Sequence, residues 1–211
     1  MNKTKQKILN VALDLYNKDG VSNVSIRQLA KEVGISHSNL IYHYPTQEDI
    51  ILGLHDQLLR KAVEHNKKIK LDTSPLTTLY RSTKTGFSVV YDFRFLFNDL
   101  QYICSSFPKM SATIKAVERV RSEMYRSVIN EMVAIKLIRP EAHKNEFDHL
   151  ITLIKIFSDH WLVSSSIYDD LSKEERLEKY SYLLMCHFRP YLTKKGVEEF
   201  KSIPISVPKM S

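Results

Sequence analysis

The segment 25–44 constrains the fold of this chain more than any other stretch. Its apolar residues recur at helical spacing up to Gly34, and the same pattern resumes directly after it. A serine stands in front of each run, where its hydroxyl can accept a hydrogen bond from the first turn of a helix. Gly34 can adopt the left-handed conformation that ends a helix. The segment therefore predicts two short helices, 26–33 and 37–43, joined at Gly34.

The spacing of Ala30, Gly34 and Leu40 suits a helix-turn-helix. A small residue lets the two helices touch, a glycine turns the chain, and an aliphatic residue holds the second helix against the first. We expect a DNA-binding motif here. The alternative is an ordinary helical hairpin closed by a glycine.

Composition places the chain among globular proteins. It has 211 residues, of which 43% are hydrophobic and 26% charged, and its net charge of +7 favours a polyanionic partner. Cys104 and Cys186 lie far apart and without metal-ligand spacing, which predicts reduced, buried thiols. No apolar run approaches the roughly 18 residues of a membrane span, and the basic N-terminus lacks a signal-peptide core. We expect a cytoplasmic protein, at the nucleoid when bound to DNA, with no membrane partner.

The rest of the chain also has helical patterns and no alternating strand pattern. Thr46 should cap a helix that runs to about residue 68, and prolines punctuate the remainder. The further helices are expected at 4–19, 76–92, 94–104, 109–137, 142–167 and 174–191. The predicted fold class is all-α, with a helix-turn-helix domain at 1–46, a connecting helix at 47–70, a larger C-terminal ligand-binding and dimerisation domain at 71–200 and a flexible tail at 201–211.

The first 60 or so residues contain the run A-L-D-L-Y-N-K-D-G-V-S-N-V-S-I-R-Q-L-A-K-E-V-G-I-S-H-S-N-L-I-Y-H-Y followed by P-T-Q-E-D-I. On these residues the segment resembles the TetR/AcrR family of bacterial transcriptional regulators. It is specific for about 30% of the chain and only architectural beyond that part. It implies a homodimer that binds a near-palindromic double-stranded DNA operator and is released by a small molecule.

Recognition helices contact base edges with their N-terminal side chains. Asn39 could read adenine with both groups of its amide, and Ile41 could pack on a thymine methyl group. Arg27 could instead be a solvated helix charge, and Tyr42 could instead pack in the core. The candidate DNA-binding residues are Ser25, Arg27, Ser36, His37, Ser38, Asn39, Ile41, Tyr42, His43 and Gln47.

Two residues depart from the pattern of the family. The family usually has tyrosine where Ile41 stands and lysine where Gln47 stands. The loss of a hydroxyl and a cation weakens the expected backbone contacts or moves them to an N-terminal arm that carries Lys3, Lys5 and Lys7.

Aromatic residues gather in 87–107, and an apolar cluster with scattered polar groups suits a small-molecule pocket between helices. A plain core is the alternative. If a ligand binds, it should be largely hydrophobic. The candidate ligand-binding residues are Tyr91, Phe95, Asn98, Tyr102, Phe107, Met110, Tyr125, Phe157 and Trp161.

The helices expected at 142–167 and 174–191 carry wide apolar stripes, which the family uses for a four-helix dimer interface. The alternative is an intramolecular core. The candidate interface residues are Phe147, Ile151, Ile154, Leu177, Tyr180, Leu184 and Phe188.

No pattern supports catalysis. Glu146 and His149 form one E-x-x-H, whereas a di-iron bundle needs a second such pair. His149 and His160 are separated by about 16 Å along a helix, too far to share a metal ion. We expect no catalytic residue, no metal and no cofactor.

The sequence predicts a sequence-specific DNA-binding transcriptional regulator, a dimeric repressor released by its ligand. The alternative is a helical ligand-binding or scaffold protein that does not bind DNA.

Overall fold

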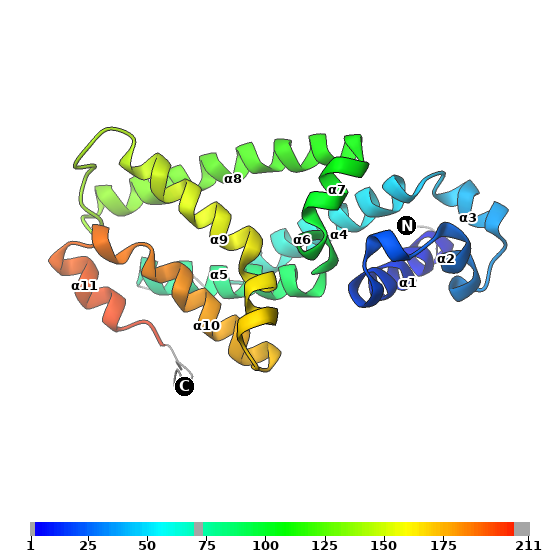
Figure 1. Cartoon of the computed structure of the whole chain (residues 1–211). Coiled ribbons are helices and arrows are strands. Elements are labelled where there is room, and N and C mark those ends of the chain that lie inside the picture. Colours follow the sequence, from blue (N-terminus) through cyan, green and yellow to red (C-terminus); the bar gives the residue numbers. More distant parts are fainter. Residues whose placement is uncertain (1–2, 70–73, 205–211) are drawn as a thin grey trace. The chain divides into compact units, whose positions relative to one another are not determined.

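A computed structural model describes residues 3–69 and 74–204 of the chain (Figure 1). Over these residues the predicted all-α fold is confirmed, since no β-strand occurs and one isolated bridge joins Ile138 to Leu192. The predicted boundary near 71–75 and the predicted tail lie partly outside the described residues. The helices are α1 (Lys3–Asp19), α2 (Ile26–Val33), α3 (His37–His43), α4 (Gln47–Lys67), α5 (Pro75–Asp92), α6 (Phe95–Asn98), α7 (Leu100–Ser106), α8 (Pro108–Ala134), α9 (Glu146–Tyr168), α10 (Lys173–Cys186) and α11 (Lys194–Lys201), with 3₁₀ turns at Val21–Asn23 and Arg189–Tyr191.

The described residues form two compact units. Unit 1 contains those of Met1–Val63 and Val89–Ala116, and unit 2 contains those of Glu64–Ser88 and Val117–Ser211. The functional domains predicted above are a different division of the chain and stay a prediction. No helix among the described residues combines the length and the apolar character that crossing a bilayer requires.

Helix α1 builds the core of unit 1 with one face. Ile8, Leu9, Ala12 and Tyr16 are buried on that face, as their i, i+4 spacing predicts. The Tyr16 ring packs on Phe95 with ring centroids 5.4 Å apart. Phe95 therefore packs in the core against α1, which is the alternative to its predicted role in a ligand pocket.

The single helix predicted at 94–104 is two helices in the structure, and both side chains and backbone near the end of α1 bind this segment. The Asp99 carboxylate accepts a hydrogen bond from the Val21 amide at 2.8 Å, and Asp99 stands between α6 and α7. The Asn17 amide group donates to the Asp92 carbonyl at 2.8 Å and accepts from the Phe95 amide at 3.1 Å. These partners are distant in sequence, so helical periodicity alone could not predict the break.

In unit 2, α9 packs against α10 (Figure 1). Trp161 of α9 stacks on Phe87 with ring centroids 4.7 Å apart and lies 5.3 Å from the Tyr180 ring. The buried carboxylate of Glu178 accepts a hydrogen bond from the Tyr80 hydroxyl at 2.5 Å and pairs with Lys84. Burial and this carboxylate raise the pKa of Tyr80. The interior of unit 2 thus combines aromatic packing with a satisfied buried charge.

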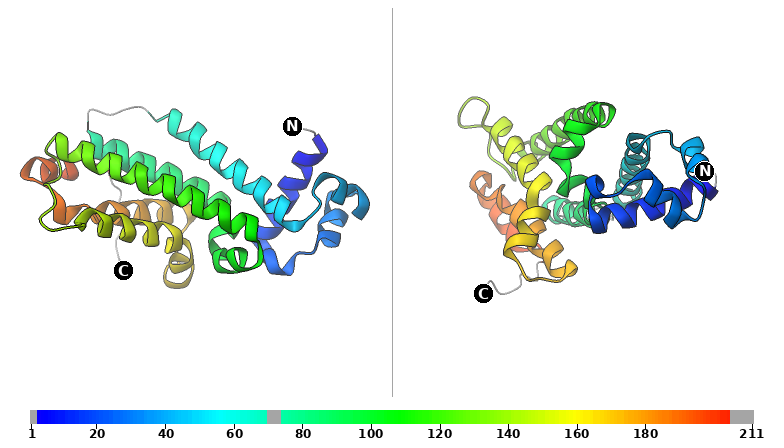
Figure 2. Two further views of the ribbon diagram at one scale, coloured as in Figure 1. Left: turned by 90° about the horizontal axis from the view of Figure 1, so that it is seen from above. Right: turned by 45° about the vertical axis from the view of Figure 1, so that its right-hand side comes forward.

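The sequence missed α11 and extended α10 too far. Helix α10 ends at Cys186, and α11 lies beside it in both figures, with the Tyr182 and Phe200 rings 6.2 Å apart (Figure 2). The Glu199 carboxylate accepts hydrogen bonds from the Ser74 hydroxyl and the Leu76 amide, both at 2.9 Å. It therefore caps the first turn of α5, whose amides have no partner within the helix.

The N-terminus of α11 closes the C-terminal end of α8. The Thr193 amide donates to the Leu137 carbonyl at 3.0 Å, and its hydroxyl donates to the Lys136 carbonyl at 2.6 Å. The Lys195 ammonium donates to the Ile135 carbonyl at 3.1 Å. These bonds satisfy the carbonyls of residues 135–137, which directly follow α8.

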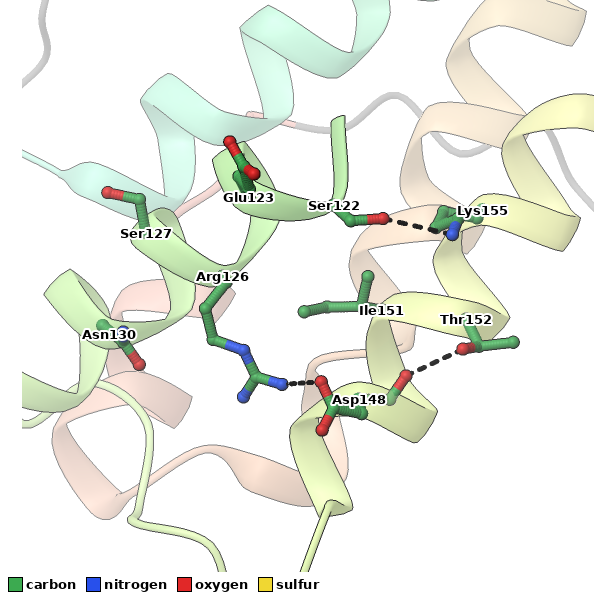
Figure 3. Close-up of a pocket in the computed structure, with 9 residues that line it drawn as sticks. All are labelled: Ser122, Glu123, Arg126, Ser127, Asn130, Asp148, Ile151, Thr152 and Lys155. Atoms are coloured by element: carbon green, nitrogen blue, oxygen red, sulfur yellow. Dashed lines mark hydrogen bonds and ion pairs between the residues drawn. The ribbon is translucent and has the colours of Figure 1, made fainter. Parts of the chain in front are cut away.

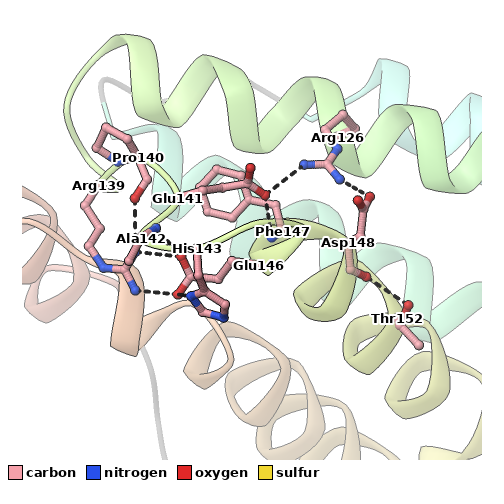
Figure 4. Close-up of polar contacts among 10 residues, drawn as sticks. All are labelled: Arg126, Arg139, Pro140, Glu141, Ala142, His143, Glu146, Phe147, Asp148 and Thr152. Carbon is pink, nitrogen blue, oxygen red and sulfur yellow. Dashed lines mark hydrogen bonds and ion pairs between the residues drawn. The ribbon is translucent and has the colours of Figure 1, made fainter.

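The α8–α9 loop is held by a polar network (Figure 4). The predicted helices 109–137 and 142–167 are shorter here, because Lys136 and Asn145 adopt left-handed backbone conformations with φ of 63° and 64°. Two Arg139 nitrogens donate to the Glu146 carboxylate at 2.7 and 2.8 Å, and the Ala142 amide donates to it at 2.7 Å. These bonds hold the pKa of Glu146 at about 2, below its ordinary value of 4.5.

Replacing Glu146 by glutamine should therefore lower the melting temperature at neutral pH. A carboxylate with a depressed pKa stabilises the fold fully above pH 4.5, and this contribution is lost as the pH falls through about 2. Between pH 6 and pH 2 the melting temperature of the native protein should fall more steeply than that of the variant. Glutamine at the exposed Glu174 is the matched control. Parallel pH profiles for the native protein and Glu146→Gln would contradict the assignment.

Candidate DNA-binding interface

Helices α2 and α3 form the predicted helix-turn-helix, and local bonds fix both of their starts. The Ser25 hydroxyl accepts from the Gln28 amide at 3.1 Å, and the Ser36 hydroxyl accepts from the Asn39 amide at 3.1 Å. Gly34 ends α2 in the left-handed region with φ of 76°. This conformation favours glycine because a side chain at positive φ strains the backbone.

Buried apolar residues hold the two helices together. Ala30 and Val33 of α2 and Leu40 of α3 are each at most 2% exposed, and they belong to one core cluster. The Ile35 amide donates to the Ala30 carbonyl at 3.0 Å, which closes the turn between the helices. One face of α3 is therefore fixed, and the opposite face remains available.

The available face of α3 is polar. His37, Ser38 and Asn39 in its first turn are exposed, and Tyr42 is 82% exposed, so Tyr42 does not pack in the core. Ile41 and His43 are half-buried, and the His43 ring meets the Tyr42 ring edge-on at 5.2 Å. Ser25 and Arg27 at the start of α2 are also exposed. The predicted candidates, Gln47 excepted, thus occupy the first turns of α2 and α3 and the end of α3.

Gln47 is the exception, since its side chain turns inward. Its amide nitrogen donates to the Val21 and Val24 carbonyls at 3.0 and 3.1 Å. It also bonds to Tyr16, whose pKa burial raises to about 12. Where a lysine would reach toward a phosphate, this glutamine ties the chain ahead of α2 to the start of α4. The Gln47 side chain is therefore not among the DNA contacts that we propose.

Two of the three N-terminal lysines are engaged within unit 1. The Lys7 ammonium donates to the Val33 carbonyl at the end of α2 at 2.7 Å, and the Lys5 ammonium lies 5.7 Å from the centre of the Tyr44 ring. Both residues are part of α1, which begins at Lys3, rather than of an extended arm. A cation at the negative end of α2 steadies the helix that supports α3.

The predicted ligand residues are divided between the two units. Tyr91, Phe95, Asn98, Tyr102, Phe107 and Met110 belong to unit 1, while Tyr125, Phe157 and Trp161 belong to unit 2. In unit 2, Phe157 lies near the Phe87, Tyr180 and His187 rings, with centroid distances of 6.5, 6.1 and 5.0 Å. The indole nitrogen of Trp161 is buried and has no hydrogen-bond partner in the part of the chain that the structure describes. A buried N–H group without an acceptor is uncommon in folded proteins.

A groove of about 660 Å³ lies between α8 and α9 (Figure 3). All the residues that line it are polar except Ile151. Arg126 of α8 pairs with Asp148 of α9 across the groove, and Lys155 of α9 donates to the Ser122 hydroxyl of α8. None of the predicted ligand residues lines this groove. Its cations are already paired, since Lys155 also lies 2.7 Å from Glu118. It therefore differs from the apolar pocket that the sequence predicted.

The structure buries the predicted dimer residues within unit 2 itself. Each of Phe147, Ile151, Ile154, Leu177, Tyr180, Leu184 and Phe188 is at most 7% exposed. They form the intramolecular core that was the alternative reading. The exposed apolar residues of α9 are Leu153, Ile156, Ile167 and Tyr168, at 52%, 57%, 66% and 78%. The helical spacing of Leu153, Ile156 and Ile167 could have revealed this second stripe, but the stronger inward stripe obscured it.

Two family models match the sequence. The one described as "Bacterial regulatory proteins, tetR family" matches residues 8–54, and the one described as "Bacterial transcriptional repressor" matches residues 57–200. The HTH-type transcriptional regulator RutR of Escherichia coli (strain K12) is 27% identical over 89 residues, 42% of each chain. An HTH-type transcriptional regulator of Staphylococcus aureus (strain USA300) is 32% identical over 68 residues, 32% of this chain and 37% of that protein. The matches thus span less than half of these curated relatives.

Solved structures share the fold over nearly the whole length. A TetR-family transcriptional regulator from Marinobacter aquaeolei VT8 superimposes with a TM-score of 0.82 at 20% identity, covering 95% of this chain and 96% of that one. A TetR transcription regulator from Haloarcula marismortui ATCC 43049 gives 0.71 at 17% identity, covering 92% and 100%. At these identities the likeness establishes the architecture alone.

Proposed function

Because this chain belongs to the TetR family of bacterial regulatory proteins and is a DNA-binding transcriptional regulator, we propose that it acts as a dimeric repressor of a near-palindromic operator. We further propose that a small, largely hydrophobic effector releases it from DNA, and that it works in the cytoplasm at the nucleoid. The observation that carries the DNA-binding part is the exposed polar first turn of α3 on a helix fixed through Leu40.

Selection of bound fragments from random DNA tests the proposal. We expect enrichment of two inverted half-sites about one helical turn apart, because a two-fold dimer presents two copies of α3. Asn39→Ala should lose about 1–3 kcal/mol of discrimination at one base pair per half-site. Recovery of unrelated fragments with no shared sequence would overturn sequence-specific binding.

Arg27→Ala should weaken binding about tenfold on every DNA sequence, because we assign Arg27 to a phosphate. Its exposed guanidinium stands in the first turn of α2. In a plot of log affinity against log salt concentration, the magnitude of the slope should decrease by about 0.9 for each phosphate contact that is lost. Arg60→Ala is the control, since Arg60 is exposed on α4 and pairs with Asp56. A loss confined to the selected operator would give Arg27 a base-reading role instead.

The dimer is proposed to form through the exposed apolar stripe of α9. Ile156→Asp should raise the dimer dissociation constant more than about 100-fold, because each subunit would bury an unpaired carboxylate. Val120→Asp is the matched control, since Val120 is 65% exposed on α8. Sedimentation equilibrium provides the measurement. A native protein that stays monomeric at every concentration would overturn the dimer.

The effector is proposed to bind in the aromatic interior of unit 2. Support comes from the rings around Trp161 and from its buried indole N–H, for which a ligand oxygen would be a suitable acceptor. Trp161 is the chain's only tryptophan, so its fluorescence reports on this interior. Binding compounds should change the emission and release DNA in the same concentration range. Unchanged emission across a broad apolar panel would argue against a pocket there.

A further inference from the structure

Four exposed residues of α9, two of which belong to its apolar stripe, have a palindromic spacing. His149, Leu153, Ile156 and His160 follow one another at intervals of four, three and four residues, and all four side chains are exposed. At 3.6 residues per turn they fall within an arc of about 60° on the helix surface. The pattern therefore reads the same in both chain directions, with its centre between Ile154 and Lys155.

A palindromic stripe is self-complementary when two copies of the helix pack antiparallel. A two-fold axis through the centre of the stripe makes such an arrangement, and each residue then meets its mirror position on the other copy. Leu153 would meet Ile156 of the partner subunit, and His149 would meet His160 of the partner subunit. The apolar pair would lie at the axis, with one histidine pair at each end.

We propose that these two histidine pairs bind divalent transition-metal ions, of which zinc is the probe of choice, and thereby tighten the dimer. The inference rests on the proposed dimer of α9. Within one chain the two histidines lie about 16 Å apart, so neither subunit alone could form the site. Imidazole is a preferred ligand for zinc, copper and nickel, and zinc binds each nitrogen at about 2.0–2.1 Å.

The neighbouring carboxylates do not compete for this role. Asp148 pairs with Arg126, and Asp159 accepts a hydrogen bond from Arg121 at 2.8 Å, so both turn toward α8. No group of three metal-ligating side chains occurs among the residues that the structure describes in the single chain. The metal would hold one imidazole from each subunit and complete its coordination with water.

The first test measures the dimer dissociation constant of the tag-free protein in zinc and in chelator. At a zinc concentration ten times the dissociation constant of a site, two linked sites should tighten the dimer about 100-fold. His149→Gln and His160→Gln should each remove this effect, and His143→Gln, an exposed histidine of the α8–α9 loop, should keep it. Equal dissociation constants in zinc and chelator would overturn the metal site and leave the dimer standing. A monomer in both conditions would overturn both.

The second test exploits the antiparallel register. The native dimer should bind two zinc ions, and the homodimer of either single variant should bind none, because each of its pairs has lost one histidine. A heterodimer of one His149→Gln subunit and one His160→Gln subunit, isolated through two different histidine-free tags, should bind one zinc ion, since it retains one complete pair. Retention of zinc by either single-variant homodimer, or none in the heterodimer, would overturn the antiparallel pairing.

Discussion

Replacing Leu40 by alanine should lower the free energy of unfolding by about 2–5 kcal/mol and abolish operator binding at temperatures where the native protein is active. Leu40 is fully buried and is the one buried residue of α3. Its removal leaves a cavity between α3 and the rest of unit 1, and a helix of seven residues is too short to persist without that contact. Urea unfolding followed by circular dichroism gives the stability, and a DNA titration gives the binding.

Ile41→Ala is the matched control for Leu40. Ile41 is the next residue on the same helix and is half-buried, so its truncation removes less packing. It should cost less than half as much stability as Leu40→Ala while still weakening operator binding through the proposed thymine contact. Equal losses of stability in the two variants would mean that Leu40 does not anchor α3.

Gly196→Ala should destabilise unit 2 by about 1–3 kcal/mol or more. A Cβ atom at Gly196 would stand 2.1 Å from the Leu137 carbonyl oxygen, which belongs to backbone that already accepts the Thr193 amide. The start of α11 would have to move away from the end of α8 and lose the bonds that Thr193 and Lys195 donate there. Thermal and urea unfolding both measure the change.

Gly86→Ala provides the opposite expectation in the same unit. Gly86 lies inside α5, and a Cβ atom there would meet nothing within 4 Å. Alanine should raise stability by up to about 1 kcal/mol, because glycine is a poor helix former. If both glycine variants changed stability in the same direction, the close approach at Gly196 would not be the cause of its effect.

The parts of the fold that local chemistry controls could be predicted from the sequence. Ser25 and Ser36 cap helices within three residues of themselves, and Gly34 turns the chain through its own backbone, so neighbouring residues contain the whole signal. The helix-turn-helix and the end of α3 before Pro45 follow from the same kind of rule.

The parts that depend on distant partners could not be predicted. Asp99, at the break between α6 and α7, binds an amide 78 residues away. The start of α11 is fixed by the bond from the Thr193 amide to the Leu137 carbonyl, just after the end of α8. The sequence predicted an exposed Gln47 side chain, because its hydrogen bond to the Val21 carbonyl, 26 residues away, is visible only in the structure. Helix α9 showed a different difficulty, since periodicity identified its stronger apolar stripe, which the chain itself covers, and the weaker exposed stripe was missed.

The contact of Glu199 with Ser74 and Leu76 sets an order of events during synthesis. Leu76 leaves the ribosome 123 residues before its partner, a delay of about 6–25 s at usual rates of translation. For that time the Leu76 amide lacks its cap, although the neighbouring Ser74 hydroxyl can already accept from the Thr77 amide. Helices α1, α2 and α3, in contrast, find many of their partners within the first 54 residues. The DNA-reading part can thus form early on the nascent chain, and the fold of unit 2 is completed only when the segment around Glu199 has been made.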